Sequence, residues 1–249
     1  MPEIVGSLSK PKAMTMLQQP PPDAPSPPPS VYALRSRAKQ KWLWTIGLIC
    51  MMVCLLVLSA PMVIRCPKKA TQTEAVSNAR QLGLALLEFE SEFGCMPDFS
   101  TPKSVIKKTG TRLSFGNKSS NDFFRQLIAA EIVQSEHMFY ARVAGTRKPD
   151  GVVTGSKALE KGECGFTYFL GATEGCDPNR PLVVAPMIPG TDRFDPKPFE
   201  GKAVVLKADN SVKSLPIDEQ GHAIFEGRNL MAPGHPVWQG KPPSIAWPE

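Results

Sequence analysis

Residues 75–93 read AVSNARQLGLALLEFESEF, and their apolar side chains recur every three or four positions. This spacing places side chains on one face of an α-helix. The predicted packing face consists of Ala75, Ala79, Leu82, Leu86, Phe89 and Phe93. Gly94 suits a helix C-cap, and Pro97 cannot continue the helix. We therefore predict an amphipathic helix over residues 65–95.

A run without charged side chains, residues 42–64, precedes this helix. As a helix these residues would span about 35 Å, enough for a tilted crossing of a hydrocarbon layer about 30 Å thick. Trp42 and Trp44 stand at one rim, where indole rings favour the interface, and Ile64 ends the run. The alternative is a cleaved secretory signal, whose apolar core is usually shorter. We predict an uncleaved transmembrane helix with membrane lipid as its partner.

Positive charge is concentrated on either side of the apolar run. Residues 1–69 carry nine Lys and Arg against two Asp and Glu, a net charge of +7, whereas residues 70–249 have a net charge of −1. Basic flanks suit anionic lipid and set topology, and a neutral domain argues against nucleic acid as a partner. The slight excess before Trp42 places the N-terminus in the cytoplasm. Residues 1–41 are also rich in proline, so we predict a disordered basic tail there.

The elements expected after the amphipathic helix are short. Thr101-Pro102 and the Ser119…Asp122 pair each predict the start of a helix. Predicted strands cover residues 138–143, 165–170, 182–185, 202–208 and 211–215. Asp209-Asn210 separates the last two, which is typical of a tight hairpin. These elements predict an α+β domain over residues 96–231, followed by an irregular proline-rich tail over residues 232–249.

The cysteines and histidines do not form a known catalytic or metal motif. Outside the cytoplasm, Cys164 and Cys176 are a candidate disulfide pair, and free buried thiols are the alternative. The histidines are His137, His222 and His235, and none has a histidine partner at helical spacing. We therefore predict no cofactor and no enzyme activity.

Three aspartates, Asp192, Asp195 and Asp209, fall in loop-like sequence near the predicted hairpin. Carboxylate oxygens are ligands that Ca²⁺ prefers, which makes the three residues candidate calcium ligands. The alternative is ordinary turn chemistry, in which Asp side chains bind the local backbone. The sequence favours this second interpretation.

Two segments resemble the type IV pilin and pseudopilin family. Residues 77–86, SNARQLGLAL, resemble the "N-x-R-Q-I-G-L-A-L" stretch of type II secretion protein G-like sequences. Residues 203–212, AVVLKADNSV, are similar to the family's closing "N-V-L-F-x-D-G-H-V" hairpin. The resemblance implies a membrane helix that continues into a long helix packed on a small antiparallel sheet. No recognisable prepilin cleavage site precedes Trp42.

The family resemblance implies a protein of the bacterial inner membrane with its C-terminal domain in the periplasm. We expect a non-enzymatic, single-pass envelope protein with partners in a type II secretion or pilus-like assembly. The alternative is a membrane-tethered periplasmic enzyme or ligand-binding domain. A cleft that gathers His137, Glu163 or His222 with a carboxylate would favour this alternative.

Overall fold

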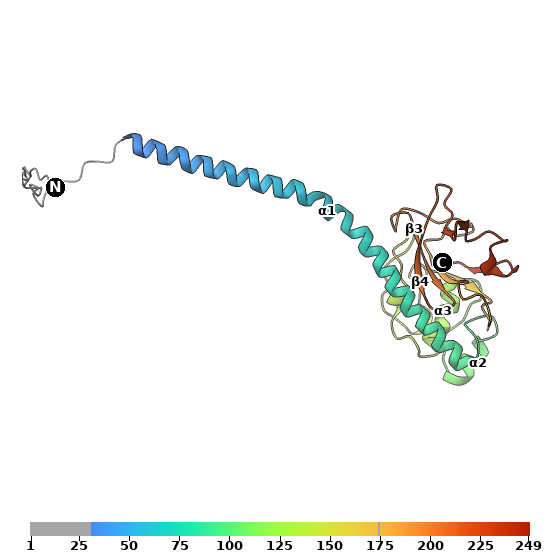
Figure 1. Ribbon diagram of the computed structural model, residues 1–249. Helices are drawn as coiled ribbons and strands as arrows, with labels where there is room; N and C mark the ends of the chain where they lie inside the picture. Colours follow the sequence, from blue (N-terminus) through green and yellow to red (C-terminus); the bar gives the residue numbers. More distant parts are fainter. Residues whose placement is uncertain (1–30, 174) are drawn as a thin grey trace, which may run out of the picture. The chain divides into compact units, whose positions relative to one another are not determined.

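A computed structural model describes the backbone of residues 31–173 and 175–249, and the side chains of residues 42–55, 69–173 and 175–249 (Figure 1). The chain divides into two compact units, Met1–Leu58 and Ser59–Glu249. The elements are α1 (Val31–Phe93), α2 (Pro102–Thr109), α3 (Ser120–Ala129), η1 (Glu136–Phe139), η2 (Gly155–Lys157), β1 (Thr167–Leu170), β2 (Pro181–Ala185), β3 (Lys202–Lys207), β4 (Val212–Pro216), β5 (Ile224–Phe225), β6 (Arg228–Asn229), η3 (Pro236–Trp238) and β7 (Ser244–Ala246).

Helix α1 begins at Val31, before the predicted boundary at Trp42. It thus includes residues 31–41, for which the sequence predicted disorder, while the rest of the predicted tail, residues 1–30, lies outside the described residues. Among the side chains that the structure describes, no helix carries an apolar stretch long enough to cross a membrane. The predicted span over residues 42–64 extends into residues 56–64, whose side chains lie outside the described ones.

The amphipathic half of α1 packs as predicted. The fully buried members of its packing face are Ala75, Ala79, Leu82, Leu86 and Phe89. These side chains share one hydrophobic core with strand residues such as Val183, Val204 and Leu206, and Phe93 packs at its border. The helix ends at Phe93, where Gly94 adopts a φ of 81° and its N–H binds Glu90 O at 2.8 Å. The predicted face therefore packs on the protein's own sheet.

The two short helices begin where the sequence predicted. Helix α2 starts at Pro102 and stops at Gly110, which has a left-handed φ of 64°. Helix α3 is started by a capping box: Asp122 N donates to Ser119 Oγ at 3.2 Å, and Ser119 N donates to Asp122 Oδ2 at 3.1 Å. The box satisfies two amides that a helix start leaves unpaired.

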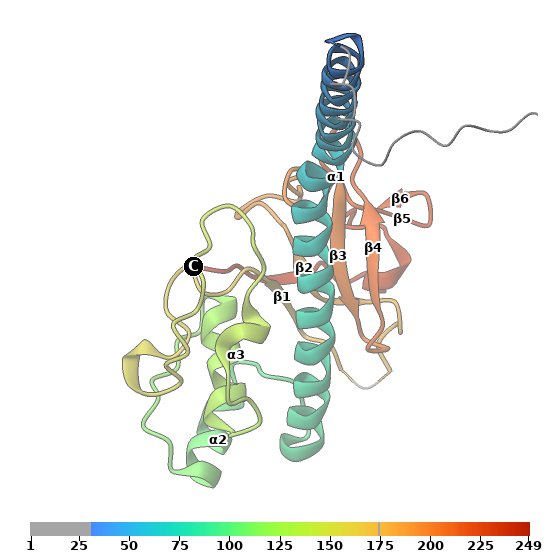
Figure 2. The same ribbon diagram turned by 90° about the vertical axis from the view of Figure 1, so that its left-hand side faces the viewer.

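Five strands form an antiparallel sheet in the order β4-β3-β2-β1-β7. Strands β1 to β4 confirm four of the predicted strands within two residues at each end. At the β3–β4 turn, Asn210 has a φ of 60° and its N–H binds Lys207 O at 2.9 Å, which confirms the hairpin. Part of α1 lies in front of β2 and β3, with α3 beside it (Figure 2). The α+β class and the antiparallel sheet are thus observed.

The strand predicted over residues 138–143 is wrong, because this segment begins inside the 3₁₀ helix η1. Ser135 Oγ accepts the N–H of His137 at 3.4 Å and starts the turn. The amide of Asn78 on α1 then donates to the carbonyls of His137 and Tyr140, at 3.0 and 2.8 Å. These carbonyls therefore accept hydrogen bonds from a side chain of α1 and not from the backbone of a neighbouring strand.

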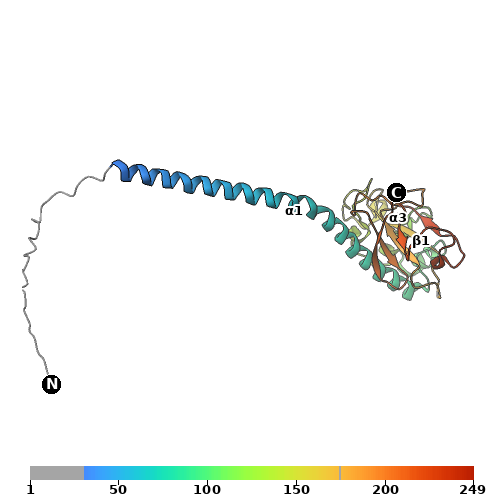
Figure 3. The ribbon, with the colours of Figure 1, turned by 45° about the horizontal axis from the view of Figure 1, so that its top comes forward.

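The proline-rich C-terminal segment is more ordered than predicted. Together with residues 217–231 it covers the second face of the sheet, where Trp238 is fully buried against Phe169 at a ring-centroid distance of 5.2 Å. Strand β7 then pairs with β1, so the prediction of an irregular tail over residues 232–249 is wrong for this part. The chain ends beside α3, where Ser120 N donates to Trp247 O at 2.9 Å (Figure 3). The sheet is therefore a middle layer between two hydrophobic cores.

Candidate functional site

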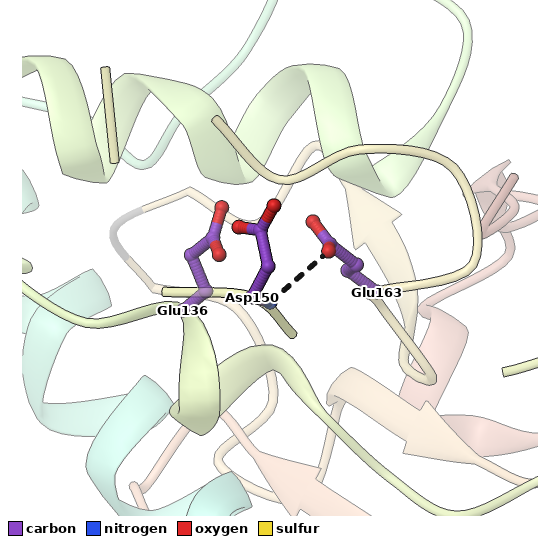
Figure 4. A group of neighbouring side chains, drawn as sticks. All are labelled: Glu136, Asp150 and Glu163. Atoms are coloured by element: carbon purple, nitrogen blue, oxygen red, sulfur yellow. Dashed lines mark hydrogen bonds between the residues drawn. The ribbon is translucent and has the colours of Figure 1, made fainter. Parts of the chain in front are cut away.

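Three carboxylates meet beside the connection that leads into β1. Glu136 is the first residue of η1, Asp150 lies on the following loop, and Glu163 lies shortly before β1. One oxygen from each lies within 4.8 Å of the others, and the side chains stand side by side (Figure 4). Glu136 and Glu163 are completely buried, whereas Asp150 is exposed. Two buried acids this close need strong compensation from hydrogen bonds or charge.

Backbone amides of the loop provide this compensation for Glu136. Its Oε1 accepts the N–H of Leu159, and its Oε2 accepts the N–H of Gly151 at 3.0 Å. Both partners lie on the connection between η1 and β1. One buried side chain thereby ties down two separate points of this connection.

Glu163 is bound in the same way. Its Oε1 accepts the N–H of Asp150 at 3.2 Å, and its Oε2 accepts the N–H of Glu160 at 2.7 Å. Arg147 adds a positive charge, with Nη2 at 3.2 Å from Glu163 Oε1 and 2.6 Å from Glu160 Oε2. Each of the four oxygens of the two buried glutamates therefore accepts one loop amide. The pair acts as a clamp on residues 150–160.

The charge balance of the clamp leaves Glu136 easier to protonate than an ordinary glutamate. Burial raises the pKa of its carboxyl, the bond from Leu159 lowers it, and the negative charge of Glu163 raises it again, with a net upward shift. Oxygen sets of this kind suit hard cations such as Ca²⁺. In this cluster, however, the oxygens of both buried acids already have amide partners, which matches a structural role.

The three predicted calcium ligands are not brought together. Asp195 Oδ1 accepts the N–H of Lys197 at 2.9 Å, and Asp209 Oδ1 accepts the N–H of Ser211 at 2.9 Å. Asp192 lies on an exposed turn, with Oδ2 at 4.0 Å from the ring of His222. The candidate calcium site is therefore not assembled, and Asp195 and Asp209 perform the turn chemistry that the sequence favoured.

The candidate pair Cys164 and Cys176 is not bonded in the structure, where both thiols are free. Cys164 is buried, with Sγ at 3.5 Å from both Ser120 Oγ and Phe166 O. Burial raises the pKa of this thiol to about 11, which leaves it unreactive at neutral pH. Cys176 is partly exposed on the β1–β2 connection. Free thiols were the alternative that the sequence left open.

The three histidines lie on different segments. His137 is exposed on η1. His222 Nδ1 lies 3.3 Å from Asp218 Oδ2, and the amide and ring of His222 help to lower the pKa of that carboxyl. His235 is buried, with Nε2 at 3.3 Å from Phe225 O. Glu163 does gather with two carboxylates, but the ion pairs of the described residues do not join it to a histidine.

The sequence did not identify the clamp. Its members are separated by more than ten residues on either side of Asp150 and belong to no motif. The sequence carries only a weak signal: Glu163 is followed at once by the residues CGFTYFL, which are mostly apolar or aromatic. Only the fold reveals that Glu136 faces the same loop.

No protein-family model matches the chain, and neither a curated protein nor a solved structure does. The fold and the clamp define an α+β protein with a helix and a five-stranded antiparallel sheet around its main core.

Proposed function

We propose that this chain is a single-pass membrane protein of the bacterial envelope, whose pseudopilin-like domain has a structural role in a type II secretion or pilus-like assembly. The observation that carries the proposal is the packing of α1 residues 75–89 on the antiparallel sheet through one apolar face. This arrangement is the one that the resemblance of residues 77–86 and 203–212 implies. A pilin-like fold, a cytoplasmic N-terminus and a periplasmic domain belong to the same proposal.

The composition of the first half of α1 supports the anchor. Its described residues 42–55 contain no charged side chain, and their large apolar side chains are exposed. Trp42 and Trp44 are 68% and 75% exposed. Such a surface is costly in water, at about 25 cal/mol per Å² of apolar area, and favourable in lipid.

A second exposed apolar pair offers a contact surface for the assembly. Leu84 and Leu87 lie on the side of α1 away from its packing face and are 61% and 38% exposed. They are three residues apart, so they are neighbours on the helix surface. Exposed apolar side chains that lie next to each other are a candidate surface for contact with another protein.

A membrane-tethered enzyme or ligand-binding domain is the second candidate, and the carboxylate cluster is the observation that favours it. Its oxygens would suit a hard cation. The four amide bonds to Glu136 and Glu163 are better explained by loop clamping. A calcium titration of the purified protein followed by calorimetry separates the two: saturable binding that Glu163→Gln abolishes would favour the second candidate.

Co-purification tests the assembly. The full chain is cross-linked in native membranes, extracted in detergent and purified, and its partners are identified by mass spectrometry. We expect envelope assembly subunits or further copies of this chain, and loss of these partners in the Leu84→Glu/Leu87→Glu variant. Ile106→Glu, at an exposed apolar position on α2, is the matched control and should retain them. A wild-type chain that purifies alone would contradict the proposal.

Topology is tested separately with a reporter enzyme that is active only outside the cytoplasm. Fused after Glu249, it should be active in cells that produce the full chain. Activity only from a reporter that requires the cytoplasm would reverse the proposed orientation.

A further inference from the structure

Two partly exposed cysteines, Cys95 and Cys176, line neighbouring hollows at the end of α1. Cys95 lines a hollow of about 430 Å³ together with Glu90, Ala172 and Thr173. The same three residues line an adjoining hollow of about 370 Å³ that also contains Cys176. Because the two hollows share these residues, they form one continuous depression.

Local bonds hold both cysteine segments at this depression. Met96, next to Cys95, lines the same hollow as Cys176. Tyr168 Oη donates to Pro97 O at 3.0 Å, which ties the segment after α1 to β1. Cys176 N donates to Thr173 O at 3.0 Å, so its backbone turns back toward a residue that both hollows share.

We propose that Cys95 and Cys176 form an intramolecular disulfide when the domain meets a disulfide oxidant. The bridge would join the C-terminal end of α1 to the β1–β2 connection. Cys164 is excluded as a partner because it is buried behind α3, in contact with Ser120. Among the described cysteines of residues 69–249, Cys95 and Cys176 are the two that are not buried.

The reaction is thiol–disulfide exchange with a small disulfide such as oxidised glutathione. The thiolate of Cys176 attacks one sulfur, forms a mixed disulfide and releases one glutathione thiolate. The thiolate of Cys95 then attacks Sγ of Cys176 and releases the second glutathione. Two protein thiols are oxidised, one glutathione disulfide is reduced to two thiols, and the thiol protons pass through solvent to the released thiolates.

Burial and the nearby charges of Asp98 and Glu90 raise the pKa of the Cys95 thiol. Because only the thiolate reacts, bridge formation is faster at higher pH. The closed loop runs from residue 95 to residue 176, and cross-links across long loops constrain the unfolded chain most strongly. The oxidised protein is therefore more resistant to unfolding than the reduced protein.

The test uses the full chain, purified in detergent, reduced, and then equilibrated in glutathione redox buffer. Free thiols are alkylated after unfolding, and peptides are mapped by mass spectrometry without reduction. We expect a peptide pair joined through Cys95 and Cys176, a loss of two hydrogen atoms from the intact mass, and alkylation of Cys164. Two glutathione adducts in place of the bridge, or a bridge to Cys164, would overturn the proposal.

Single variants sharpen this test. Cys164→Ser should retain the bridge, whereas Cys95→Ser should leave Cys176 as a glutathione adduct. The unfolding midpoint of Cys95→Ser should match that of the reduced wild-type protein, which shows that the fold is intact. The reaction is measured on purified protein, so its failure would leave the proposed anchor and assembly role untouched.

Discussion

Gly83 of α1 lies directly against Asn210 at the β3–β4 turn. A Cβ at residue 83 would lie 2.0 Å from Asn210 Oδ1 and 2.8 Å from Leu206 Cδ1, so a larger residue requires these side chains to shift. Gly83 lies in residues 77–86 and Asn210 in residues 203–212. Helix α1 and the β3–β4 hairpin therefore contact each other at these two segments.

Replacing Gly83 should weaken this contact. Gly83→Ala requires the side chains of Asn210 and Leu206 to shift, and overpacking of this kind lowers the free energy of unfolding by about 1–3 kcal/mol. The measurement is urea unfolding of the purified domain. Ser77→Ala, at an exposed position on the same helix, is the control and should change stability by less than about 0.5 kcal/mol.

A double variant separates the clash from a general helix effect. Asn210→Gly removes the obstructing side chain, and glycine accepts the φ of 60° at this position. Gly83→Ala should therefore cost less in the Asn210→Gly background than in the wild type. An equal cost in both backgrounds would show that the contact does not limit residue 83.

The capping box of α3 gives a second stability prediction. Asp122→Ala removes the acceptor of the Lys118 and Ser119 amides and the partner of Arg125, at 2.8 Å. We expect a loss of about 0.5–2 kcal/mol in urea unfolding at pH 7. Ser104→Ala, exposed on α2, is the control. An Asp122→Ala protein as stable as this control would contradict the role of the box.

The same residue predicts a pH dependence. Burial alone would raise the pKa of Asp122, but the amides of Lys118 and Ser119 and the charge of Arg125 lower it overall. Its contribution is therefore present above the ordinary value of 3.8 and is lost as the pH falls through the lowered pKa. The stability difference between wild type and Asp122→Ala should shrink in acid. If the stability difference between wild type and Asp122→Ala instead grows as the pH falls below 3.8, the lowered pKa of Asp122 is contradicted.

For Glu136 we predict the opposite change of stability with pH. Its pKa is raised, so the stability that its proton provides is present below the ordinary value of 4.5 and is lost as the pH rises through the raised pKa. Glu136→Gln cannot lose this proton. The free energy of unfolding of wild type minus that of the variant should fall as the pH rises above 4.5, measured by urea unfolding across a pH series. A rise in this difference would contradict the electrostatics described for the clamp.

Trp238 lies in the second hydrophobic core, between the sheet and the C-terminal segment. Replacing it therefore tests whether this segment stabilises the sheet. Its indole N–H donates to Leu230 O at 2.7 Å, and its ring packs on Phe169. Trp238→Ala should lower the free energy of unfolding by about 3–5 kcal/mol, because a large buried ring is removed. Ile188→Ala, at a 41% exposed position, is the matched control. Equal effects of the two substitutions would mean that this layer does not stabilise the sheet.

The sequence predicted the elements that local rules determine. The stripe from Ala75 to Phe89 has helical spacing, the Ser119…Asp122 pair is a capping box, and Asn210 tolerates positive φ, so each was recognisable without tertiary information. The segment around His137 was not, because the amide of Asn78, far away in the sequence, binds its carbonyls. Strand β7 was not recognisable either, because it is a short edge strand among prolines that forms by pairing with β1.

The sequence did not reveal the clamp either, because it also depends on contacts between residues that are far apart in the sequence. In the sequence Glu136 looks like an ordinary surface acid, and Glu163 is considered only as a possible member of a cleft. The role of both depends on loop amides that fold around them. The weak calcium candidate is not assembled, because Asp195 and Asp209 already bind the backbone of their own turns, as the sequence favoured. Local turn chemistry was sufficient to account for these two residues.

The central proposal is that residues 42–64 hold this domain at a membrane, and alkaline carbonate extraction of cell membranes tests it most directly. Carbonate removes peripheral proteins but leaves integral ones in the pellet. We expect the full chain in the pellet and a chain that begins at Lys69 in the supernatant, with the same unfolding midpoint for the domain. A full chain released by carbonate would contradict the proposal.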